Sequence, residues 1–137
     1  MMMCELCEKT GGTVLWQDEF CRVILAGEAD YPGLCRVVLS RHAKEMTDLS
    51  PAEQIRLFSV VMAVEATVRE IMAPDKINLA SLGNVVPHLH WHVIPRYSDD
   101  KHFPNSIWGE SKRAASPRPV AVRLEEKMRQ ALEKRLT

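Results

Sequence analysis

The ten residues PHLHWHVIPR, from Pro87 to Arg96, contain three of the five histidines in this 137-residue chain. His88, His90 and His92 occupy alternate positions, and a single apolar residue separates each from the next. Proline is confined to the ends and edges of sheets, so we expect a strand to begin near Pro87. Successive side chains of a strand face opposite sides of the sheet, so this pattern puts the three histidines on one face and the apolar residues on the core face.

Three interpretations suit such a row of imidazoles. A polar strand face at the surface is the simplest one. A zinc site with three histidine ligands is the second, because His-x-His on a strand has suitable ligand geometry. The third is nucleophilic attack on phosphorus, since a neutral imidazole carries a free electron pair at neutral pH and its neighbours can donate to the phosphate oxygens. The histidines alone leave all three open.

Composition narrows the function classes. Lys plus Arg and Asp plus Glu both number 18, so the chain lacks the basic excess expected of a nucleic-acid-binding protein. No apolar run reaches the length of a membrane span. The start, MMMCELCEKT, does not resemble a secretory signal, so we expect a cytoplasmic protein in which the four cysteines are thiols or metal ligands.

The rest of the chain predicts an α+β fold with an antiparallel sheet of about five strands. The expected strands are 14–16, 22–26, 35–39, 76–83 and a last one from Pro87. Ser50, Pro51 and Glu53 form the start of a main helix with a capping box, and apolar residues continue at helical spacing to Met72. A second amphipathic helix is expected from about Val120 to the C-terminus.

The stretch HLHWHVI resembles the motif His-φ-His-φ-His-φ-φ, with φ apolar, of the histidine triad (HIT) family of nucleotide hydrolases and transferases. LSRH, ending at His42, resembles the family's IPKKH, and GNVVPH resembles its GQSV-x-H. The likeness covers about residues 4–108. It implies a HIT domain over 1–110 and a C-terminal extension over 111–137, whose amphipathic helix packs on the same domain.

The resemblance also implies roles for individual residues. His90 would be the nucleophile that takes a nucleotidyl group, and His92 would donate to the phosphate oxygens. Asn78, Asn84 and Trp108 would join His92 in binding the nucleotide. The implied substrates are dinucleoside polyphosphates or nucleoside phosphoramidates that contain AMP, and relatives of this family are homodimers.

Two departures from the family pattern support a competing hypothesis, a nucleotide-binding sensor or scaffold with little catalysis. Val85 stands where the family has Ser or Thr, and Leu34 stands where it has His. The acidic residue that would bind the ribose is also unassigned, with Glu28 and Asp30 as the nearest candidates.

Cys4 and Cys7 form a C-x₂-C pair, which is half of a tetrahedral zinc site. Some bacterial HIT proteins and the related galactose-1-phosphate uridylyltransferases complete such a site with two histidines, which correspond here to His42 and His88. The resemblance therefore implies a structural zinc with these four ligands. Cys21 and Cys35 are expected to fill the core.

Overall fold

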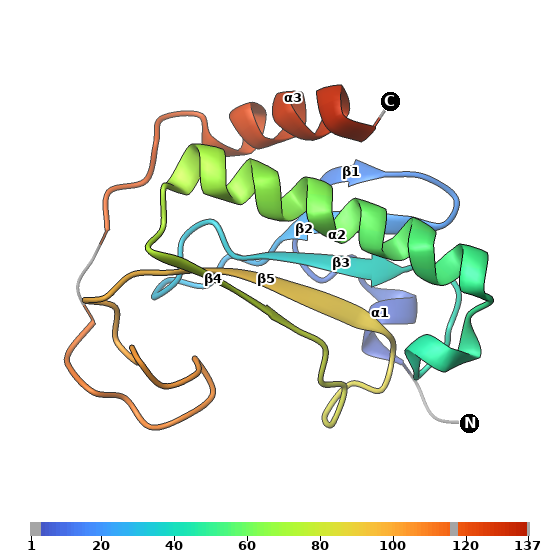
Figure 1. Cartoon of the computed structure of the whole chain (residues 1–137), viewed down its shortest axis with the longest axis horizontal. Helices are drawn as coiled ribbons and strands as arrows, with labels where there is room; N and C mark the ends of the chain where they lie inside the picture. The colour runs from blue at the N-terminus through green and yellow to red at the C-terminus, as the bar shows by residue number, and fades with distance from the viewer. Residues whose placement is uncertain (1–3, 116–117, 137) are drawn as a thin grey trace.

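The structure is a computed structural model that describes residues 4–115 and 118–136. A five-stranded antiparallel sheet in the order β1-β2-β3-β5-β4 is packed against two long helices (Figure 1). The elements in chain order are α1 (Glu5–Glu8), β1 (Thr13–Gln17), β2 (Cys21–Leu25), β3 (Cys35–Leu39), a 3₁₀ turn η1 (Met46–Asp48), α2 (Pro51–Met72), β4 (Lys76–Ala80), β5 (His90–Arg96) and α3 (Leu124–Leu136). The predicted fold class is confirmed.

Helix α2 begins where the capping box places it. The Ser50 hydroxyl accepts from the backbone N–H of Glu53, and the Glu53 carboxylate accepts from the N–H of Ser50. These two bonds satisfy backbone donors that a helix N-terminus leaves free. The helix ends at Ala73, which adopts a left-handed conformation with φ of 46° just before Pro74.

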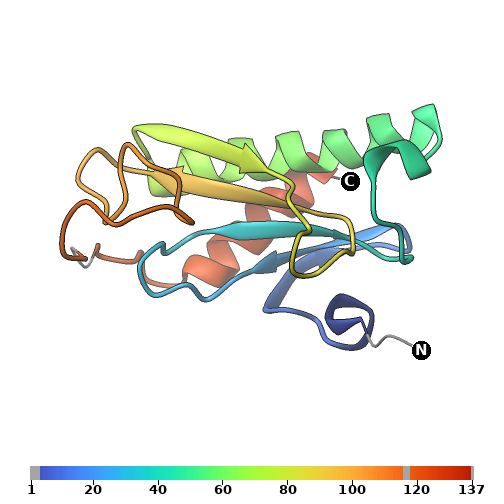
Figure 2. The same ribbon diagram turned by 90° about the horizontal axis from the view of Figure 1, so that it is seen from below.

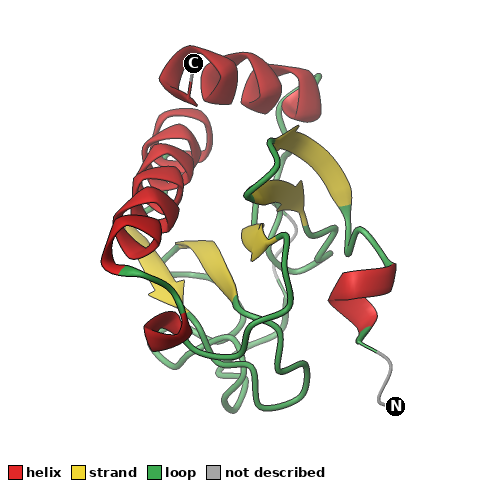
Figure 3. Cartoon of the chain, turned by 90° about the vertical axis from the view of Figure 1, so that its right-hand side faces the viewer, coloured by secondary structure: helices red, strands yellow, loops and turns green. Residues whose placement is uncertain are grey.

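The two faces of the sheet have different surroundings, as Figures 2 and 3 show. On one side, α2 and α3 cover the main apolar core, which includes Leu89 and Val93 of the histidine stretch together with the buried Cys21 and Cys35. On the other side lies the short helix α1, held by a small apolar cluster. The histidine face of the sheet is therefore the face that α2 and α3 leave uncovered. No helix in the described part of the chain has both the length and the apolar content to span a bilayer.

Three expected boundaries differ from the structure by three residues or more. Strand β4 ends at Ala80, whereas the expected strand extends to residue 83. Strand β5 begins at His90 and not at Pro87, because the backbone N–H groups of His88 and Leu89 donate to Val86 and Ala43 outside any ladder. Helix α3 begins at Leu124 and not near Val120, since Arg123 has a φ of 60° that turns the chain just before the helix. Val120 is consequently about half exposed and is not part of the buried stripe.

Candidate active site and metal centre

His90 and His92 line a cleft on the sheet face opposite the two long helices. The cleft has a volume of about 480 Å³, which is within the usual range for small-molecule sites. Gly83, with a φ of +76°, turns the chain after β4 so that the following loop forms one wall. The lining residues are Glu5, Leu6, Gly11, Arg36, Leu82, Gly83, Asn84, Val85, Val86, His90, His92 and Trp108.

His90 is held in a defined tautomer. Its Nδ1 lies 2.6 Å from the backbone carbonyl oxygen of His88. A carbonyl oxygen only accepts, so Nδ1 carries the proton and Nε2 keeps the free electron pair. The side chain is 8% exposed, which limits the orientations of the ring. His90 thus presents an oriented nucleophile or base to the cleft.

His92 lies beside His90, with 5.0 Å between the ring centroids, and its other neighbour is Trp108 at 4.9 Å. Burial, reinforced by His90 and by the positive charge of Arg36, lowers the pKa of His92 to about 4. The ring is therefore neutral at physiological pH. Its Nδ1 is buried and has no hydrogen-bond partner among the described residues, so this ring retains polar capacity for another group.

The four residues predicted to bind zinc come together. Cys4, Cys7, His42 and His88 each direct one ligand atom to a common point, and all four atoms lie within 4.8 Å of one another. The shortest separations, between Nδ1 of His88 and the three other ligand atoms, are 3.3–3.4 Å. Two sulfurs and two imidazole nitrogens are the donor set that tetrahedral zinc prefers.

His88 is oriented toward this group by a second contact. Its Nε2 donates to the backbone carbonyl of Leu39 across 2.7 Å, so the free electron pair is on Nδ1, the atom that faces the two cysteines. Burial lowers the pKa of His88 and keeps the ring neutral. A hydrogen bond from the non-ligating nitrogen to a carbonyl is the usual support for a metal-bound histidine.

The residues predicted to bind the nucleotide are divided by the structure. Asn84 and Trp108 line the cleft with His92. The carboxamide of Asn78 instead accepts a hydrogen bond from Arg96 at 2.7 Å, and Asn78 is not among the lining residues. Arg96 is 2% exposed and pairs with Asp100, so Asn78 helps to position the segment after β5.

The residues that depart from the family pattern have clear positions. Val85 is 92% exposed at the cleft, where it presents methyl groups and no hydroxyl. Leu34 is buried in a separate apolar cluster, away from the lining residues. Glu28 contacts Arg36, and Asp30 contacts Lys101. Neither acid is among the residues that line the cleft.

Sequence reasoning missed several lining residues. Glu5 and Leu6 reach the cleft because they lie between the two cysteines, whose positions are set by long-range contacts. Arg36 was also missed, although a charged residue in the apolar stretch CRVVL of β3 was a usable signal. The fifth histidine, His102, has its Nδ1 2.7 Å from the Tyr31 hydroxyl.

Three known proteins show what this chain is similar to. A histidine triad protein from Marinobacter aquaeolei has a TM-score of 0.77 and 29% identity, with 97% of this chain and 98% of that one covered. A zinc-bound histidine triad family protein from Mycobacterium smegmatis has a TM-score of 0.63 and 22% identity over 90% and 85%, a likeness of fold alone. The bis(5'-nucleosyl)-tetraphosphatase (asymmetrical) of Schizosaccharomyces pombe is 28% identical over 87 residues, which are 60% of this chain and 48% of that protein.

The chain therefore spans about half the length of this curated relative. The HIT domain model matches residues 8–99. This range includes strands β1 to β5 and all three histidines, His88, His90 and His92. With this match over more than half of the chain and the same fold in a structural neighbour, the chain belongs to the HIT domain family.

Proposed function

We propose that this protein cleaves or transfers nucleotidyl groups through a covalent intermediate on His90. Nε2 of His90 would attack the phosphorus of the nucleotidyl group, and the bond from phosphorus to the leaving group would break with its electron pair. Water would then attack the same phosphorus and release the nucleoside monophosphate, which restores the free imidazole. The substrates we propose are dinucleoside polyphosphates or nucleoside phosphoramidates, with AMP as a product.

One observation carries this proposal, the 2.6 Å contact between Nδ1 of His90 and the carbonyl oxygen of His88. It supports a nucleophilic role because the free electron pair is on the other ring nitrogen and the ring needs no deprotonation before it attacks. The same carbonyl stabilises the positive charge that the imidazole acquires when Nε2 bonds to phosphorus. A polar surface strand would not need a buried histidine with an oriented tautomer.

The surroundings of His90 suit a phosphoryl transition state. His92 is neutral and retains a nitrogen without a partner among the described residues, and Asn84, which also lines the cleft, can supply a further donor. Donors fixed in a partly buried site stabilise the charge that accumulates on nonbridging oxygens. The relative from Schizosaccharomyces pombe, named as a tetraphosphatase, supports the choice of dinucleoside polyphosphates as the first substrates to test.

The decisive experiment is an acid-free quench with adenine-labelled diadenosine tetraphosphate or an AMP phosphoramidate. We expect a labelled protein adduct that is stable in alkali and labile in acid, as a phosphorus–nitrogen bond to histidine should be. His90→Ala should form no adduct and should lose turnover by a factor on the order of 10³ or more, while AMP binding persists. Substantial residual turnover in His90→Ala would exclude His90 as the nucleophile.

The sensor hypothesis is favoured by one specific observation, the exposed apolar side chain of Val85 at the cleft. In a pocket that binds nucleotide without catalysis, AMP would bind but neither adduct nor product would form. Val85→Ser provides a matched test, because it restores the hydroxyl at a site where the side chain meets no packing constraint. A higher turnover in this variant than in the wild type would contradict the sensor hypothesis and would indicate a catalytic site whose rate Val85 lowers.

We also propose that Cys4, Cys7, His42 and His88 hold one structural zinc ion. The donor set fits, and the Nε2–H of His88 is already committed to Leu39. When bound, zinc would act as a cross-link and would supply no chemistry to the phosphoryl group. It would fix the segment that contributes Glu5 and Leu6 to the cleft wall. Such thiolate ligands suit a reducing compartment, which supports the cytoplasm as the location.

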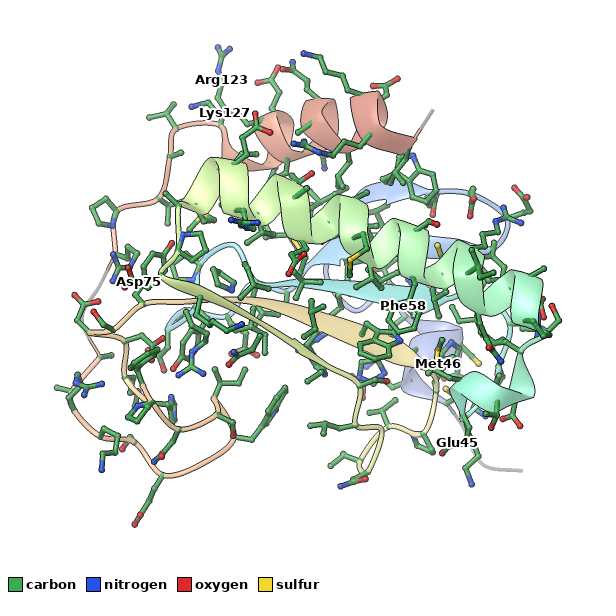
Figure 4. All side chains as sticks on the ribbon, in the orientation of Figure 1. Glu45, Met46, Phe58, Asp75, Arg123 and Lys127 are labelled. Carbon is green, nitrogen blue, oxygen red and sulfur yellow. The ribbon has the colours of Figure 1, made fainter. Side chains whose placement is uncertain are left out.

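A homodimer is the assembly that we propose. Ile55, Phe58 and Met62 recur at helical spacing on α2 and are 69%, 41% and 43% exposed. They form an apolar groove with Met46, and Figure 4 shows Phe58 and Met46 at the same end of α2. Strand β4 lies at one edge of the sheet, where a second copy can add its own strand. Sedimentation should give a dimer, and Ile55→Lys should give a folded monomer.

A further inference from the structure

Arg36 occupies an unusual place for a charged side chain. It lies in the middle strand of the sheet, and its direct ladder neighbours are Ile24 on β2 and His92 on β5. Paired residues of an antiparallel ladder project to the same face, so Arg36 and His92 emerge side by side into the cleft. A guanidinium in the floor of an apolar sheet is costly unless its donors find acceptors.

The described residues offer few acceptors to the hydrogen-bond donors of this guanidinium. Its ion pair in the described part of the chain is with Glu28, at 3.8 Å between Nη2 and Oε1, and the Glu28 side chain is 51% exposed. A pair this long and this exposed contributes little free energy. Nε of Arg36 is buried and has no acceptor among the described residues. A buried donor left unpaired keeps its full desolvation penalty.

A second arginine on the same face provides the contrast. Arg22 lies one strand away, and its guanidinium donates to the backbone carbonyls of Leu6, Lys9 and Thr10 at 2.8–3.0 Å. Arg22 therefore has a structural role, because its hydrogen bonds hold the N-terminal segment at Leu6, Lys9 and Thr10 against the sheet. Arg36 has no comparable set of acceptors in the part of the chain that the structure describes, so its charge is not explained by contacts within that part.

A second buried nitrogen without a hydrogen-bond partner lies next to Arg36. In the described residues, three buried side-chain nitrogens lack a partner, and two of them are Nε of Arg36 and Nδ1 of His92. These two residues are paired in one rung of the β3–β5 ladder, and both line the cleft. His92 is 7% exposed, so its nitrogen is not compensated by bulk water. An oxyanion is the group that would satisfy a guanidinium in this place.

We propose that Arg36 is an anion-binding residue of the cleft, so that the preferred substrate carries a second oxyanion in addition to the phosphoryl group that His90 attacks. The inference rests on the proposed function and narrows its substrate class. Two sources have the required chemistry, the remaining phosphates of a polyphosphate chain and a carboxylate on the leaving group. Among the described residues, the ion pair with Glu28 engages the Nη2 end of the guanidinium.

The test uses the wild-type chain and three variants with two pairs of AMP derivatives. The glycine and glycinamide phosphoramidates of AMP differ by one carboxylate. Diadenosine tetraphosphate and the p-nitrophenyl ester of AMP differ by a charged phosphate chain. Arg36→Leu removes the positive charge. Arg36→Lys keeps the charge but removes the planar guanidinium, which can donate two parallel hydrogen bonds to one anion. Lys127→Leu removes one positive charge on the far helix α3, as Figure 4 shows, and serves as the matched control.

Arg36→Leu should lower kcat/KM for the member of at least one pair that carries the second anion by roughly ten- to a hundredfold, mainly through KM. It should change kcat/KM for the members without that second anion by less than about threefold, and Lys127→Leu should change none of them. Arg36→Lys should recover part of the loss. The pair that responds identifies the source of the anion. Equal effects on all four compounds, or no effect on any, would overturn the proposal.

Calorimetric binding to the His90→Ala protein, with and without Arg36→Leu, separates this inference from the proposed function. If wild-type protein cleaves none of the compounds but Arg36→Leu weakens binding of the anionic ones selectively, the nucleotidyl-transfer proposal fails and the anion site stands. If cleavage proceeds but binding does not depend on Arg36, the anion site fails alone. If no compound binds to either protein, both are rejected.

Discussion

The backbone carbonyl of His88 accepts the Nδ1–H of His90 across 2.6 Å, while the imidazole of His88 faces Cys4 and Cys7. One residue thus contacts the candidate nucleophile through its main chain and the candidate metal centre through its side chain. We therefore expect a change at the candidate metal centre to affect the carbonyl that orients His90, because both contacts belong to the same residue.

Removal of one thiolate should separate stability from catalysis. Cys4→Ser should lower the zinc content well below one ion per chain and lower the midpoint of thermal unfolding by roughly 5–10 °C, because the cross-link between α1 and the sheet is lost. Turnover per folded molecule should fall less. Glu8→Gln, on the same short helix but outside the ligand group, is the control and should retain zinc. If Cys4→Ser retains zinc and His90→Ala loses it, the metal is held by the triad.

Acid should destabilise the protein through His92. Its pKa is about 4 in the folded state and near 6.5 in the unfolded state. Between these two pH values the unfolded chain is protonated at His92 and the folded chain is not. The stability associated with His92 is complete above pH 6.5 and declines as the pH falls toward 4, by up to about 3 kcal/mol. Urea unfolding of the wild type and of His92→Asn between pH 4.5 and 7.5 should show a shallower slope for the variant. Parallel slopes would contradict this assignment.

The N-cap of α2 should contribute to stability and not to catalysis. Ser50→Ala removes the hydroxyl that accepts from the N–H of Glu53 and should cost about 1 kcal/mol in urea unfolding, with unchanged kcat and KM. Ser59→Ala is the matched control, since its hydroxyl bonds to the Ile55 carbonyl within the helix. That substitution should change the free energy of unfolding by less than about 0.5 kcal/mol. Equal effects of the two changes would argue against the cap.

The buried ion pair of Arg96 and Asp100 should hold the segment that carries Trp108. Burial opposes ionisation of Asp100, but hydrogen bonds from Arg96 and from backbone N–H groups hold its pKa well below the usual value. Asp100→Ala leaves Arg96 buried without its partner and should cost about 3–5 kcal/mol of unfolding free energy. It should also speed tryptic cleavage at Lys101 and weaken nucleotide binding.

The neighbouring Asp99 offers the control for this prediction. Its side chain is 66% exposed and pairs with Arg118 at the surface. Asp99→Ala should therefore change the unfolding free energy by less than about 1 kcal/mol and leave the protease pattern as in the wild type. Equal destabilisation by the two alanine substitutions would show that burial of the Arg96 pair is not what secures this segment.

The elements that the sequence predicted are those with a local cause. Alternation of histidine and apolar residues identifies a strand with a polar and a core face, and Leu89 and Val93 lie in the core accordingly. The Ser50–Glu53 capping box determines the start of α2 because its hydrogen bonds span three residues. The family resemblance of the triad is likewise a property of consecutive residues, and the HIT domain match confirms it.

Other features depended on contacts between residues far apart in the chain. Evenly spaced histidines carry no sign that His88 precedes β5 and turns to Cys4 and Cys7, more than eighty residues away. Asn78 faces Arg96 and not the cleft because the β4–β5 ladder and the segment after it bring those polar groups together. Arg36 meets His92 only through the β3–β5 register.

By itself, then, the sequence determined the α+β fold, the strand and helix pattern and the histidine motif, since each follows from periodicity, capping or identity within a short window. The tertiary structure decided which nitrogen of each histidine is free, which residues line the cleft and which charge lacks a partner. The physical reason is that hydrogen-bond satisfaction depends on all neighbours in space. Those neighbours are set by the pairing of strands whose residues lie tens of positions apart in the chain.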